Sequence, residues 1–140
     1  MRFVVDTNIW IKFLQGNQRV HERLQRAMAA GDEVVVTPVA YYEVMRGLEK
    51  RGDQESIARI RTVWDGLTYV EARREVWDEA VRLWVLCVKQ NQKRDDADTI
   101  LAAFTSVFDA VIVTADRHFD VFDFQVQNWA SDSGDPFPND

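Results

Sequence analysis

Short apolar runs alternate along this chain with longer segments of helical periodicity. The runs of strand length lie at residues 2–6, 33–36, 67–70, 111–114 and 124–127. The expected helices lie at about residues 7–14, 20–30, 38–50, 57–65, 76–88 and 95–107. Strands that alternate with helices indicate a parallel sheet, so the sequence predicts an α/β fold.

The ends of the expected helices carry ordinary boundary signals. Thr37 and Pro38 are suited to the N-cap and first turn of a helix that runs through Glu43. Gly31 and Gly52 are placed to end helices. These signals support the predicted order of elements.

Length and composition favour one soluble domain. The chain has 140 residues, which fits one compact domain over residues 1–130 and a polar C-terminal tail over residues 131–140. Its single cysteine, Cys87, cannot form an internal disulfide, which favours a reducing cytoplasm. No signal pattern and no apolar run of about 18 residues is present, so we expect a cytoplasmic protein with no membrane segment.

The charge balance is acidic. The 17 Lys and Arg residues against 23 Asp and Glu residues give a formal net charge of −6. Overall charge therefore does not predict nucleic-acid binding, and a polyanion would need a local basic patch or a metal ion.

Four acidic residues are placed to meet at one edge of the predicted sheet. Asp6 and Asp116 follow expected strands, Glu43 lies early in a helix after another strand, and Asp98 lies near the start of a helix. The carboxyl edge of a parallel sheet is where open α/β folds place their sites. Clustered carboxylates repel one another, and an all-oxygen ligand set selects a hard cation, Mg²⁺ or Mn²⁺.

Each of these acids also has a structural alternative. Asp6 can cap the following turn, and Glu43 can be a solvent-facing helix residue. If Asp95 is an N-cap, Asp98 is a first-turn acid favoured by the helix dipole. Asp95 or Asp96 can also supply a ligand, and Asp116 can be a turn residue. Only the convergence of all four on one edge favours a site.

Four segments, in order, resemble the motifs of the PIN domain, and in particular of its small VapC-type toxins. They read VVDTN at 4–8, TPVAYYE at 37–43 with Gly47, DTILAA at 98–103, and VTAD at 113–116 with Phe119. The segment FQVQNW at 124–129 resembles the family's close. Asn128 stands where the family usually has a proline, and Asp116 where relatives often have Asn.

The resemblance implies a twisted parallel β-sheet flanked by α-helices and a metal-dependent endoribonuclease. It implies the toxin of a type II toxin–antitoxin system that cleaves a structured RNA, forms a homodimer and is blocked by a cognate antitoxin. Two alternatives stay open: an RNA-processing nuclease without an antitoxin, and a non-catalytic RNA-binding module.

The expected roles of the site residues follow from phosphodiester hydrolysis. Asp6 and Asp98 are the expected direct ligands of a first Mg²⁺ or Mn²⁺, with Glu43 bound directly or through water. Asp116 completes the site, and one-metal and two-metal chemistry both stay open. The candidates for hydrogen bonds to the ligands are Thr7, Asn8 and Thr114, and strand-end polar residues are the alternative. The candidates for RNA contact are Arg46, Lys50, Lys93 and Arg94.

The tryptophans give the last expectation. Trp64, Trp77 and Trp84 cannot all fit easily into one small core. We expect some of them to face a second subunit or an antitoxin helix, since aromatic residues are enriched in such interfaces.

Overall fold

A computed structural model describes residues 1–131, apart from the side chain of His118, and these residues form a five-stranded sheet. The strands are β1 (Arg2–Val5), β2 (Glu33–Val36), β3 (Thr68–Tyr69), β4 (Val111–Val113) and β5 (Val126–Gln127). Their order is β3-β2-β1-β4-β5, and every pair is parallel. The predicted α/β class is confirmed, and apart from Ser131 the predicted polar tail lies outside the described residues.

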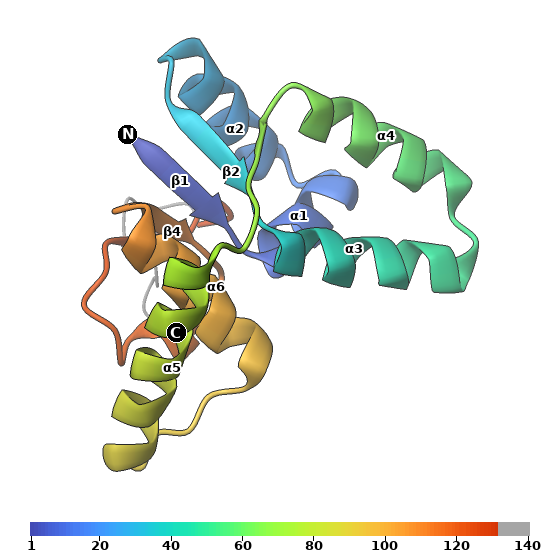
Figure 1. The fold of residues 1–140 in the computed structure, drawn as a ribbon. Coiled ribbons are helices and arrows are strands. Elements are labelled where there is room, and N and C mark those ends of the chain that lie inside the picture. The colour runs from blue at the N-terminus through green and yellow to red at the C-terminus, as the bar shows by residue number, and fades with distance from the viewer. Residues whose placement is uncertain (132–140) are drawn as a thin grey trace.

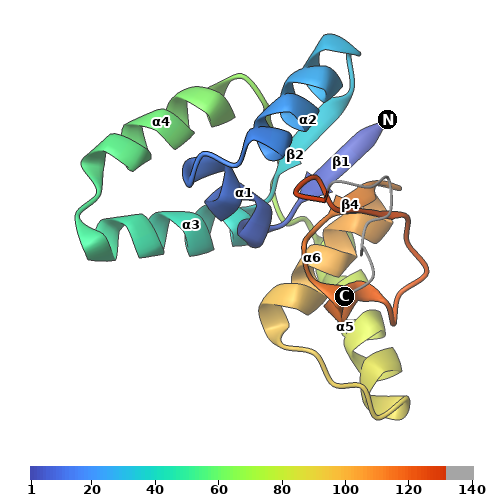
Figure 2. The same cartoon turned by 180° about the vertical axis from the view of Figure 1, so that it is seen from behind.

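Helices cover both faces of the sheet (Figures 1 and 2). On one face lie α1 (Thr7–Leu14), α2 (Gln18–Ala29), α3 (Pro38–Arg51) and α4 (Gln54–Asp65). On the other lie α5 (Arg74–Lys89) and α6 (Asp96–Val107). A short 3₁₀ helix, η1 (Arg117–Phe119), follows β4.

The alternation of side chains along β1 explains this two-sided burial. Phe3 and Val5 pack into the core under α1–α4, while Val4 packs into the core under α5 and α6. Successive strand residues point to opposite faces, and a parallel sheet is buried on both. That is why the strands read as continuous apolar runs.

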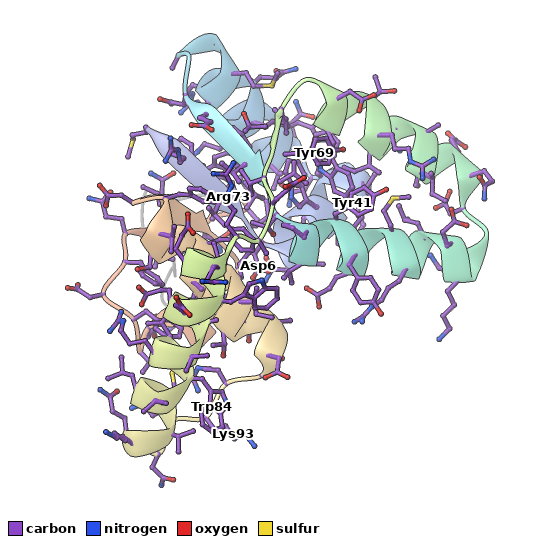
Figure 3. All side chains as sticks on the ribbon, viewed as in Figure 1. Asp6, Tyr41, Tyr69, Arg73, Trp84 and Lys93 are labelled. Carbon is purple, nitrogen blue, oxygen red and sulfur yellow. The ribbon has the colours of Figure 1, made fainter. Side chains whose placement is uncertain are left out.

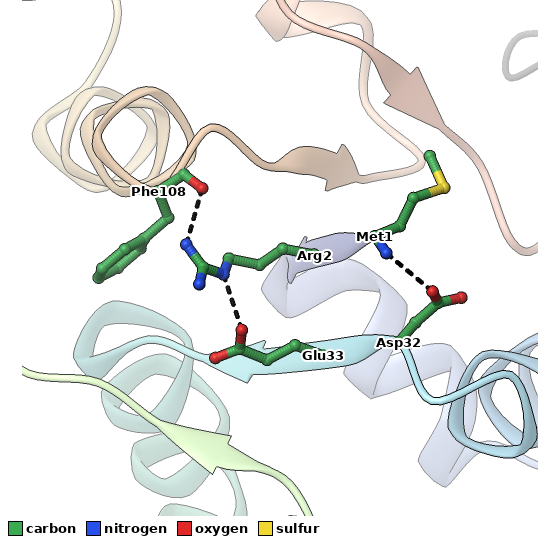
Figure 4. Close-up of polar contacts among 5 residues, drawn as sticks. All are labelled: Met1, Arg2, Asp32, Glu33 and Phe108. Atoms are coloured by element: carbon green, nitrogen blue, oxygen red, sulfur yellow. Dashed lines mark hydrogen bonds and ion pairs between the residues drawn. The ribbon is translucent and has the colours of Figure 1, made fainter.

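The amino edge of the sheet is held by polar contacts (Figure 4). The Arg2 guanidinium donates to the Glu33 carboxylate (2.8 Å) and to the Phe108 carbonyl (2.9 Å). The terminal ammonium of Met1 lies 2.9 Å from the Asp32 carboxylate. These contacts join β1, β2 and the end of α6.

Some predicted boundaries differ from the structure. Asp6 lies outside β1 and is the N-cap of α1. The predicted strand at 67–70 shortens to Thr68–Tyr69, because β3 pairs only with the last two residues of β2. Thr37 caps α3, and Gly52 ends it in the left-handed region at φ 66°. The cap and stop signals of α3 are therefore confirmed.

The tryptophans divide as expected. Trp64 is fully buried, whereas Trp77 is 48% exposed and Trp84 41% exposed, both on α5. The expectation that one core cannot enclose all three is confirmed. Across residues 1–131, no helix combines the length and apolarity needed to cross a bilayer.

Candidate active site

Asp6 lies at the point where the chain leaves β1 and enters α1. Its backbone N–H donates to the Val113 carbonyl of β4 (2.8 Å). Its Oδ1 accepts the backbone N–H of Thr7 (2.7 Å) and so caps α1. Sheet pairing and the cap together hold this buried carboxylate near the centre of the molecule (Figure 3).

A small polar network joins the carboxyl ends of β1 and β4 through this carboxylate. Asp6 Oδ2 accepts from the Thr114 hydroxyl (2.8 Å) and from Asn8 Nδ2 (3.2 Å). Asn8 Oδ1 accepts the backbone N–H of Ala115 (3.2 Å). From β1 the chain continues to β2 on one side, and β4 lies on the other, so the network sits at the switch point of the sheet.

Glu43 approaches the same edge from α3, the helix that follows β2. Its Oε1 accepts from the Thr7 hydroxyl (2.8 Å), and its Oε2 lies 3.8 Å from Arg46 Nη2. Thr7 therefore bonds through its backbone N–H to Asp6 and through its hydroxyl to Glu43. Acids that are far apart in the sequence meet across one threonine.

The electrostatics of Asp6 show that three acids share this edge. The pKa of Asp6 is raised from its ordinary value of 3.8 to about 6, chiefly by burial. The hydrogen bonds from Thr114 and Thr7 oppose this rise, and the charges of Asp98 and Glu43 add to it. The ionised carboxylate of Asp6 therefore lacks a compensating positive charge, which a nearby cation would supply.

Asp98 and Asp116 reach the edge by different routes. Asp95 is the N-cap of α6, and its Oδ1 accepts the backbone N–H of Asp98 (2.8 Å), so Asp98 lies in the first turn. The backbone N–H of Asp116 donates to the Thr114 hydroxyl (3.0 Å), which ties that residue to the network.

The donor chemistry fits a hard divalent cation, because every candidate ligand is a carboxylate oxygen. The candidate carboxylates lie at one edge of the sheet but do not surround a single point. Within residues 1–131, no three His, Cys, Asp or Glu side chains are arranged to hold a metal ion together. Glu43 is instead held by Thr7 and Arg46.

The predicted RNA-contact residues are not all near this edge. Arg46 lies beside Glu43. Lys50 lies in the last turn of α3, which extends away from the sheet (Figure 1). Lys93 and Arg94 lie in the connection from α5 to α6, and Figure 3 shows Lys93 far from Asp6.

Tyrosines at the same edge were missed as candidate functional residues. Tyr41 and Tyr42 directly precede Glu43, and both are exposed. The available signal was their position inside the motif that contains Glu43.

The family model of the PIN domain matches residues 3–125 of this chain. The chain therefore belongs to the PIN-domain family. No curated protein matches it in a sequence search.

Solved structures share this fold at low sequence identity. A chain in the crystal structure of VapBC2 from Rickettsia felis, bound to a DNA fragment from their promoter, is 14% identical with a TM-score of 0.85, covering 92% of this chain and 99% of that one. A chain of VapBC-1 from nontypeable Haemophilus influenzae is 22% identical with a TM-score of 0.78, covering 94% and 100%. A chain of a toxin–antitoxin complex from Klebsiella pneumoniae is 19% identical with a TM-score of 0.66, covering 90% and 96%.

Proposed function

We propose that this protein is a metal-dependent endoribonuclease that acts as the toxin of a type II toxin–antitoxin system and cleaves a structured RNA by hydrolysis. The observation that carries the proposal is the buried Asp6 carboxylate, whose pKa is raised to about 6 by burial and by two neighbouring acids. A PIN-domain fold with this group at its switch point suits cation-assisted phosphodiester chemistry.

Asp6 and Asp98 are the proposed direct ligands of Mg²⁺ or Mn²⁺, with Glu43 bound directly or through water and Asp116 completing the site. A bound divalent ion lowers the pKa of a water molecule and polarises phosphoryl oxygens. The PIN domain proposed for this chemistry spans residues 1–130.

The surrounding residues orient these acids. Thr114 and Asn8 fix the direction of Asp6 Oδ2, and Thr7 holds Glu43 Oε1. Glu43 Oε2 is then the oxygen that can orient an attacking water and accept its proton. Arg46, next to that oxygen, can receive a phosphate of the substrate.

The catalytic proposal is tested with purified protein and a structured RNA. We expect cleavage in Mg²⁺ or Mn²⁺, none in excess chelator, and recovery when the ion is restored, because the carboxylates alone supply no electrophile. Product ends mapped by electrophoresis should show internal cuts. Equal cleavage with chelator present would contradict the metal requirement.

The proposed partners are a cognate antitoxin and a second copy of this chain. Trp77, Val81, Trp84, Val85 and Val88 form an exposed apolar face on α5. Trp77 and Trp84 also line a groove of about 530 Å³ that extends to Asp96 and Thr99 of α6. Such a face suits an amphipathic antitoxin segment, and one of its basic side chains could reach the carboxylates.

A charge on the α5 face should disrupt these protein contacts. We expect the wild type to be a dimer by light scattering, and Val81→Glu to weaken the dimer or the antitoxin complex at least tenfold, because a charge would enter an apolar contact. Val81 is 65% exposed, so folding should survive. Met28→Glu on α2 is the matched control. A strict monomer at high concentration would remove the dimer, and an unaffected Val81→Glu protein would remove the α5 face.

A further inference from the structure

All three tyrosines of the chain lie at the carboxyl edge of the sheet and are exposed. Their exposed fractions are 38% for Tyr41, 61% for Tyr42 and 46% for Tyr69. Tyr41 and Tyr42 lie near the start of α3, and Tyr69 ends β3. We call these residues the tyrosine surface.

The tyrosine surface has a rigid base. The rings of Tyr41 and Tyr69 lie 6.2 Å apart, close together in Figure 3, and pack at 5.5 Å and 6.4 Å from the ring of Trp64. Trp64 is fully buried. Packing against Trp64 therefore holds Tyr41 and Tyr69 in place, while parts of their rings stay exposed to solvent.

Tyr42 is linked to the candidate active site through Arg46. The Arg46 guanidinium lies over its ring, 5.0 Å from the centroid, and also 3.8 Å from Glu43 Oε2. Glu43 in turn bonds to Thr7, which caps against Asp6. An exposed aromatic ring with a cation over it thus lies one contact away from the carboxylates.

We infer that Tyr42, together with Arg46, stacks on an RNA base beside the phosphodiester that is cleaved. This inference rests on the proposed ribonuclease function. Unpaired bases stack on aromatic rings and on guanidinium planes, and Arg46 also carries the charge that a backbone phosphate needs.

The chemistry of the tyrosine surface distinguishes it from the α5 face. The exposed aromatic residues of α5 are tryptophans set among valines, an apolar surface suited to protein. Those around Glu43 are tyrosines accompanied by Arg46, a polar and cationic surface. In an acidic protein, this pairing of a ring and a cation beside the carboxylates favours a nucleic-acid occupant.

The test measures binding to the full-length chain in the inactive Asp6→Asn background. The probes are a labelled single-stranded RNA oligonucleotide and an abasic strand of the same length. We expect Tyr42→Ala to weaken single-strand binding about five- to hundredfold and to leave abasic binding unchanged, because only stacking is lost. Tyr42→Trp should retain binding. Trp84→Ala, an exposed aromatic on α5, is the matched control.

The other outcomes are separable. Unchanged single-strand binding by Tyr42→Ala, or an equal loss on the abasic strand, overturns the inference. A change of oligomeric state in Tyr42→Ala assigns the residue to a protein interface and also overturns it. If the wild type cleaves no RNA with any divalent ion while binding still depends on Tyr42, the ribonuclease proposal fails and the stacking site stands.

Discussion

The Asp6→Asn protein should lose RNA cleavage by on the order of a thousandfold or more, because a metal's several kcal/mol of charge stabilisation would be lost with its buried ligand. Cleavage rates in Mg²⁺ and Mn²⁺, under single-turnover conditions, provide the measurement. Full activity in the purified variant would remove Asp6 from the site.

Substitutions of three further acidic residues accompany this experiment. Asp32→Asn, at the opposite edge of the sheet, should keep full activity. Asp98→Asn should behave like Asp6→Asn. If Asp95→Asn abolishes cleavage and Asp98→Asn does not, the ligand on α6 has been assigned to the wrong residue.

The Asp6→Asn substitution should not destabilise the metal-free fold. The pKa of Asp6 is raised in the folded state, so its ionised form opposes folding: the penalty is absent below pH 3.8 and complete above about pH 6. Its full size is roughly 3 kcal/mol at pH 7. Asn keeps only one acceptor oxygen, and the lost hydrogen bond offsets about 1 kcal/mol of the gain.

The free energy of unfolding in urea, with chelator present, tests this sign. Asp6→Asn should be about 1–2 kcal/mol more stable than wild type at pH 7, and the difference should vanish or reverse near pH 4. A variant that is less stable at pH 7 than at pH 4, relative to wild type, would contradict the electrostatic account.

Expression of the wild type alone should arrest bacterial growth, and Glu43→Gln should not. The amide keeps the size of the side chain but cannot accept a proton from water or bind a cation as a carboxylate does. Colony counts after induction should fall by orders of magnitude for wild type only, with equal amounts of soluble protein.

Glu49→Gln is the matched control, since Glu49 is an exposed acid on the same helix. It should remain toxic. Co-expression of the antitoxin should restore growth with wild type. If an active, folded wild type is harmless, an RNA-processing nuclease without an antitoxin becomes the better assignment.

Local sequence patterns predicted most of the fold. The valine-rich runs predicted β1, β2 and β4. A parallel sheet is buried on both faces, so apolar residues follow one another along these strands instead of alternating with polar ones. The short strands β3 and β5 were predicted too long, because pairing partners, not local composition, set their length.

The acids of the candidate site were named from the sequence, but their geometry was not predictable from it. Asp6 was recognisable from its place after a strand, but its contact with Thr114 joins residues 108 positions apart and depends on strand order. The meeting of Thr7 with Glu43 likewise depends on how α3 crosses the sheet. Lys93 was predicted near RNA from its charge and its place before the helix of Asp98, and neither of these gives its distance from Asp6.

The two outermost strands have a consequence for recognition. In the sheet formed by residues 1–131, β3 and β5 are each two residues long. An edge so short gives an incoming peptide almost no backbone ladder to extend, which disfavours partners that bind by β-augmentation and guards against edge-to-edge aggregation. Specificity is then left to side chains on helices, which can change by substitution while the sheet stays as it is.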